Sequence, residues 1–188
     1  MTKLFLSLHV LAAVLAIGPV TVAASMFPAA LRRATAATAA RAPGTGEPGD
    51  PRDPRDPDDR DALANLRMLH RVCRVYAAVG TAVPVLGFVT ASSLGVLGSA
   101  WLIVSIVLTT AAAAVLALLI LPGQDAALAA LQDQDRDRDP NKDQAPAPGP
   151  VAAPRSAARL AMLTGIFNLL WATVTVLMVI RPGSTTGA

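Results

Sequence analysis

Residues 75–124 read VYAAVGTAVPVLGFVTASSLGVLGSAWLIVSIVLTTAAAAVLALLILPGQ and contain no Asp, Glu, Lys or Arg. The hydrocarbon core of a bilayer is about 30 Å thick, and about 20 helical residues cross it. A charge-free run of 50 residues is therefore too long for one span and suits two spans joined by a short turn. Small residues at 91–95 and at 98–99 place that turn near the middle of the run.

The composition of the whole chain agrees with a membrane protein. Hydrophobic residues make up 53% of the 188 residues and charged residues only 15%, against about 25% charged residues in a typical soluble domain. Two further charge-free stretches cover residues 4–31 and 160–180. We therefore predict an all-α fold, a four-helix transmembrane bundle that forms one integral membrane domain. The expected spans are at about 4–28, 73–91, 100–121 and 160–180.

The charged residues are collected in two segments between the spans. Residues 50–55 repeat the unit Asp-Pro-Arg, and residues 145–154 read APAPGPVAAP. Because proline interrupts helices and these segments offer little to bury, we predict disordered loops at about 34–61 and 132–156. Residues 62–74 combine leucines with arginines and are expected to form an amphipathic turn or two on the membrane surface that leads into the second span.

The distribution of basic residues predicts the orientation in the membrane. Fourteen of the 16 Lys and Arg residues lie in the two long loops and their borders, and only Lys3 and Arg181 lie outside them. Positive residues near the ends of spans remain in the cytoplasm. We expect a multi-pass protein of the cell membrane with both termini extracytoplasmic and both long loops cytoplasmic. Since the basic residues flank apolar helices, the net charge of +3 indicates contact with the lipid bilayer, and no nucleic-acid partner is predicted.

Two stretches carry a resemblance to known proteins. LFLSLHVLAAVLAIGPVTVAASMFP (residues 4–28), with Arg32-Arg33 soon after, and LHRVCRVYAAVGTAVPVLGF (residues 69–88) resemble a bacterial family of predicted four-span membrane proteins catalogued only as a domain of unknown function. That resemblance implies an architecture and no activity. The opening helix with His9 also resembles small four-helix haem-associated membrane proteins, including a bacterial protoporphyrinogen oxidase type.

Few residues of this chain are suited to chemistry. The histidines are His9 and His70, and in an antiparallel pair of spans they are offset by about 19 residues, or roughly 28 Å, too far apart to ligate one haem. His70 lies among arginines, where contact with lipid headgroups is expected. The spans contain no carboxylate, and Cys73 is the only thiol. We predict no catalytic residue, no metal site and no cofactor, with haem on His9 as the alternative.

Polar and small residues inside the spans form two candidate features. A candidate intramembrane polar site between the first, third and fourth spans consists of His9, Thr109, Thr110 and Asn168. The alternative is that these residues only make hydrogen bonds between helices. In the second span, small or kinked positions at helical spacing predict a helix-packing face, which consists of Gly80, Pro84, Gly87 and Ala91.

Three classes of function remain open. The absence of a catalytic constellation favours a protein that is not an enzyme, with a structural or assembly role in the bacterial cytoplasmic membrane and a homo-oligomer or another membrane protein as partner. The Gly18-Pro19 and Pro84 positions and a polar face on the last span suit a small transporter or permease component. The third class is a haem-linked membrane redox protein that uses His9.

Overall fold

The structure is a computed structural model that describes residues 2–40, 57–137 and 153–182. The described residues are almost entirely helical, and no strand occurs among them. The elements are α1 (Thr2–Ala40), α2 (Pro57–Gly80), α3 (Ala82–Leu94), α4 (Ala100–Ala114), the π-helix η1 (Val115–Ile120), α5 (Leu121–Asp137) and α6 (Ala153–Ile180).

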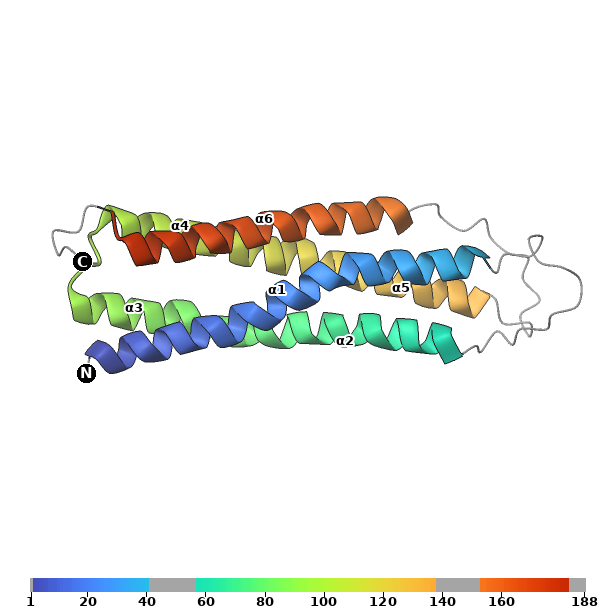
Figure 1. Ribbon diagram of the computed structural model, residues 1–188, viewed down its shortest axis with the longest axis horizontal. Helices are drawn as coiled ribbons and strands as arrows, with labels where there is room; N and C mark the ends of the chain where they lie inside the picture. The colour runs from blue at the N-terminus through green and yellow to red at the C-terminus, as the bar shows by residue number, and fades with distance from the viewer. Residues whose placement is uncertain (1, 41–56, 138–152, 183–188) are drawn as a thin grey trace, which may run out of the picture.

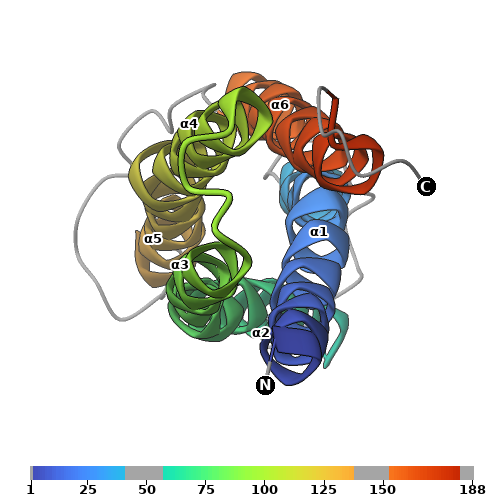
Figure 2. The same ribbon diagram turned by 90° about the vertical axis from the view of Figure 1, so that its left-hand side faces the viewer.

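These elements form four long rods: α1, α2 with α3, α4 with η1 and α5, and α6. The rods lie side by side along the long axis of the molecule (Figure 1) and run alternately up and down. Viewed from the end, α1 lies between α2 and α6, and the α4–α5 rod completes the ring (Figure 2). The N-terminus, the α3–α4 turn and the end of α6 share one end of the bundle. We call the opposite end, which leads to residues 41–56 and 138–152, the loop side.

Each rod is long and apolar enough to cross a membrane. The four candidate spans are Lys3–Ala36, Asp61–Leu94, Ala100–Gln134 and Arg155–Ile180. Their apolar side chains point largely outward, and in the second rod only 11% of the most apolar window is buried. Soluble proteins rarely expose large continuous apolar patches, so an apolar surface of this extent is typical of helices that contact lipid. The prediction of an all-α protein with four apolar membrane-length helices is confirmed.

The α3–α4 turn follows the small residues of the sequence. Gly95 adopts φ 67°, a left-handed conformation that glycine takes without strain, and the Val96 N–H donates to the Ala91 carbonyl at 3.1 Å. This hydrogen bond closes the end of α3. At the same end of the bundle, the Arg181 guanidinium lies 5.9 Å from the centre of the Trp101 ring, a cation–π contact that ties α6 to α4.

Two prolines change the helical pattern without ending a rod. Pro84 has no N–H for the Gly80 carbonyl, and there the chain makes a tighter turn in which the Thr81 N–H donates to Ala78. Pro122 follows η1, where the Leu121 N–H donates to the Leu116 carbonyl five residues earlier. We expect the apolar span to end at Pro122-Gly123, with a short helical extension through Leu128 and Leu131; the helix continues through Pro122 and runs further than that extension, to Asp137.

The rods extend beyond the charge-free stretches on the loop side. The 39 residues of α1 span about 58 Å, nearly twice the thickness of the hydrocarbon. A core of buried residues from all four rods begins at the loop-side ends of the charge-free stretches and continues into the extension; we call it the loop-side core. It consists of Phe27, Leu31, Ala34, Leu66, Ala127, Leu128, Ala157 and Leu160.

The loop-side core corrects two expectations. Residues 62–74 lead into the second rod, but they do not lie on the membrane surface, because Leu66 of α2 is fully buried in this core and Leu63 and Leu69 pack against it. The predicted loops are also shorter than expected. Residues 34–40, 57–61, 132–137 and 153–156 are helical, while 41–56 and 138–152 lie outside the described residues.

A pair of neighbouring substitutions in α2 tests the loop-side core. Leu66→Ala removes a fully buried side chain and should lower the free energy of unfolding by about 2–5 kcal/mol. Met68→Ala changes a side chain that is 67% exposed and should have a much smaller effect. Thermal melting of the detergent-solubilised variants measures the difference. Equal melting temperatures would show that α2 does not pack against the bundle at this level.

Candidate functional site

His9 lies between α1 and α3. Its side chain is 9% exposed, and its Nδ1 is 3.1 Å from the carbonyl oxygen of Val83. Because a carbonyl only accepts hydrogen bonds, Nδ1 must carry the proton and donate it, which leaves Nε2 as the unprotonated nitrogen of the neutral ring. A Cβ atom on Gly87 would lie 2.9 Å from His9 Cε1, so the imidazole packs directly against the backbone of α3.

The helix-packing face predicted in the second span lies partly against α1. Gly87 faces His9, and a Cβ on Gly80 would lie 3.8 Å from the Cβ of Ala16. Ala91 is buried, whereas Pro84 is exposed and borders a cavity described below. At Gly80 and Gly87, therefore, the neighbour that approaches closely is α1 of the same chain.

The two glycines should respond differently to the addition of one methyl group. Gly87→Ala places a Cβ too close to the hydrogen-bonded imidazole and should lower the free energy of unfolding by about 1–3 kcal/mol. Gly80→Ala places its Cβ at an ordinary contact distance and should be neutral or slightly stabilising. Thermal melting in detergent compares them. The double variant His9→Ala/Gly87→Ala should recover part of the loss, and a further decrease would contradict the steric explanation.

Asn168 of α6 faces α1 near the middle of the molecule. Its Nδ2 donates to the Ser25 hydroxyl at 3.3 Å, and one turn earlier the Thr164 hydroxyl donates to the Ala24 carbonyl at 3.4 Å. The Oδ1 atom of Asn168 is buried without a partner among the described residues. These contacts join α6 to α1 at a level well separated from His9, since 16 residues of α1, about 24 Å, lie between His9 and Ser25.

The four residues of the predicted polar site are therefore not brought together. His9 bonds to α3, and Asn168 bonds to a serine of α1 instead of the expected threonine. The Thr110 hydroxyl is exposed and donates to Ile106 of its own helix. Thr109 lines the central cavity. Counting residues along the spans predicts only a depth for Asn168, and the direction in which each helix faces depends on packing that a count does not contain.

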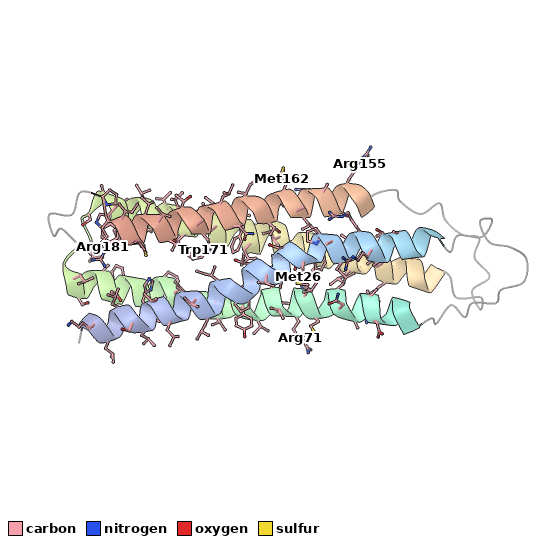
Figure 3. The ribbon with its side chains drawn as sticks, viewed as in Figure 1. Met26, Arg71, Arg155, Met162, Trp171 and Arg181 are labelled. Atoms are coloured by element: carbon pink, nitrogen blue, oxygen red, sulfur yellow. The ribbon has the colours of Figure 1, made fainter. Side chains whose placement is uncertain are left out.

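The central cavity has a volume of about 180 Å³ and is lined by residues of all four rods. Its walls are mainly apolar, and the polar groups of the lining belong to Tyr76, Thr81, Thr109 and Trp171. Trp171 makes an edge contact with Phe167, with 6.3 Å between ring centres. Its Nε1 is buried and has no hydrogen-bond partner within the described part of the chain. Figure 3 shows Trp171 on α6.

A second polar cluster lies between α2 and α5 and corrects the expectation for His70. His70 is only 8% exposed and does not face lipid headgroups. Its Nδ1 lies 3.0 Å from Gln124 Oε1, and Gln124 Nε2 donates to the buried Cys73 sulfur at 3.7 Å. On the other side of the ring, Nε2 lies 3.0 Å from Asp125 Oδ1, whose side chain is 61% exposed. The cluster thus connects a buried imidazole and thiol to the surface through one carboxylate.

The bonding pattern constrains the proton on His70. Gln124 Oε1 only accepts, so Nδ1–H donates to it, and Nε2 must also be protonated before it can form an ion pair with Asp125. The Nε2–Oδ1 contact is short, but its direction is not that of a hydrogen bond.

A signal for this cluster was present in the sequence: Leu66, His70 and Cys73 have the spacing of one buried helical face, and Gln124 and Asp125 end the charge-free run.

Candidate ligands for a metal or a haem are few. Within residues 2–40, 57–137 and 153–182, no three His, Cys, Asp or Glu side chains are grouped so that they could hold a metal ion. For haem, the hydrogen bond at Nδ1 leaves Nε2 of His9 as the nitrogen that could ligate iron. The prediction of no cofactor, with haem on His9 as the alternative, stays a prediction.

The chain was also compared with known proteins. No protein-family description, no curated protein and no solved structure matches it, so the functional argument rests on the contacts described above.

Proposed function

We propose that this chain is a multi-pass protein of the bacterial cytoplasmic membrane with a structural or assembly role. The observation that carries the proposal is the loop-side core, which joins the loop-side ends of all four rods where the charge-free stretches end. Side chains from all four rods are buried there, so the helix ends are held together as one body. A rigid extension of this kind suits the presentation of segments 41–56 and 138–152 to a partner.

The use of polar side chains supports the same proposal. His9, Thr164 and Asn168 each bond to a neighbouring rod, and the His70–Gln124 pair joins α2 to α5. Such bonds between membrane helices contribute about 0.6 kcal/mol on average and at most near 2 kcal/mol. They stabilise one arrangement of the bundle. Contact with a second copy or with another membrane protein would then use surfaces other than the glycines that face α1.

We infer the orientation from the basic residues. Arg32, Arg33, Arg155 and Arg159 border the loop side, whereas Lys3 and Arg181 are the basic residues of the opposite end. The loop side is therefore placed in the cytoplasm. A reporter that is active only in the cytoplasm, fused after Ala188, should be silent, while the same reporter inserted within residues 138–152 should be active. The reverse pattern would invert the topology.

A small transporter or permease component is the second candidate function. The observation in its favour is the central cavity, which lies among all four rods and has Trp171 in its lining. Irregular helix segments are common at transport sites, and both the Thr81 break and η1 contribute residues to this lining. A transported molecule of this volume would be small and mainly apolar.

Two variants separate the candidate functions. Replacing residues 41–56 and 138–152 by Gly-Ser linkers of equal length should release the protein from a larger assembly if the role is structural. Ala113→Leu narrows the central cavity and should leave that assembly intact, as should its control Ala114→Leu, which is exposed outside the lining. Native electrophoresis of mild-detergent extracts and growth of a deletion strain carrying each variant are the measurements. A wild-type monomer, with growth impaired by Ala113→Leu alone, would favour transport.

A further inference from the structure

A larger hollow lies on the loop side between α1, α5 and α6. Its volume is about 580 Å³. One end is formed by apolar side chains that include Leu118, Leu119 and Leu163, and the other end includes Gln134, Arg155 and Arg159. We call this hollow the α5–α6 groove. The two helices meet where Gly123 touches Leu160, since a Cβ on Gly123 would lie 2.9 Å from Leu160 Cδ2, and Figure 1 shows them apart at their loop-side ends.

The groove crosses the boundary between apolar and polar surroundings. Arg159 directly precedes the charge-free stretch 160–180, so it marks the level at which the hydrocarbon begins. Leu163 lies one helical turn deeper, about 6 Å, and Arg155 lies one turn further out. Leu118 and Leu119 are 70% and 40% exposed and lie within the apolar part of their rod. The groove is therefore apolar at hydrocarbon depth and cationic at headgroup depth.

The cationic end of the groove is formed by two arginines of α6. Arg155 and Arg159 are spaced four residues apart, which places them next to each other on α6. Both are exposed, and neither has an ion-pair partner among the residues that the structure describes. In Figure 3, Arg155 projects outward from the start of α6. Two neighbouring guanidinium groups repel each other, and a phosphate between them would remove that repulsion and accept hydrogen bonds from both.

We propose that the α5–α6 groove binds one anionic phospholipid from the loop-side leaflet. Its phosphate lies between Arg155 and Arg159, and one acyl chain follows the surface formed by Leu118, Leu119 and Leu163. The groove should prefer anionic to zwitterionic phospholipids, because the headgroup of a zwitterionic lipid brings a cation close to the same arginines. The lipid completes the packing of α5 against α6 where the two helices separate.

Native mass spectrometry of the full chain tests the site. The protein is purified in detergent with equimolar phosphatidylglycerol and phosphatidylcholine, and the wild type should retain one phosphatidylglycerol in preference. Arg155→Gln/Arg159→Gln should weaken that retention roughly 30-fold, the scale expected for two arginine contacts near a membrane surface. Arg67→Gln/Arg71→Gln, with the same change in charge on α2, should retain the lipid; Figure 3 shows Arg71 on the opposite side of the bundle from Arg155.

A second pair of variants tests the groove without changing charge. Ala130→Leu fills part of the lining, whereas Ala129→Leu adds the same side chain at an exposed position outside it. Only Ala130→Leu should reduce lipid retention, with the melting temperature of the lipid-free protein unchanged in both. Equal retention of the two lipids, equal losses from the two arginine pairs, or displacement by inorganic phosphate alone would overturn the proposal. So would a dimer that Ala130→Leu dissociates, since a second copy would then occupy the groove.

Discussion

Hydrocarbon offers no hydrogen-bond partner to a peptide group, and this constraint governs the whole structure. A chain that crosses it must satisfy its own N–H and C=O groups within helices. The described residues do so in four rods, and the short turn at Gly95 lies at one end of the bundle. Because lipid solvates apolar side chains as well as another helix does, the rods associate through close contact and hydrogen bonds instead of hydrophobic burial. The contacts of α1 with Gly80 and Gly87 are of this kind.

On the loop side a different force holds the same helices. Near and beyond the ends of the charge-free stretches, burial of Leu66 and Leu128 away from water is favourable in itself. The bundle thus combines a membrane part that depends on small residues with an extension that depends on a conventional core. The His70 cluster lies between the two parts, at the level where the Asp125 carboxylate reaches the surface. A polar cluster is expected at this boundary, because its charged member can remain solvated.

The sequence predicted the parts of the fold that depend on composition. Absence of charge located the apolar stretches, and glycine with serine located the turn, because both signals act locally. The loop-side extension was missed, since Leu63, Leu66 and Leu69 give the same pattern on a membrane surface as against a helix. The candidate polar site could not be predicted either. Its members share a depth or a face in the sequence, yet Asn168 faces Ser25 and His9 faces Val83, and only the packing of the rods determines those directions.

The π-helix η1 determines how far α5 is rotated about the axis of the third rod relative to α4. Each residue of an α-helix turns the chain by about 100°, and a π-helical segment accommodates one residue more than an α-helix of the same length. Side chains that follow η1, among them Gln124 and Ala127, therefore face the bundle interior through a rotation that an uninterrupted α-helix would not give. In evolutionary terms, a single-residue insertion near a proline can reorient the entire loop-side helix while the preceding half of the rod keeps its contacts.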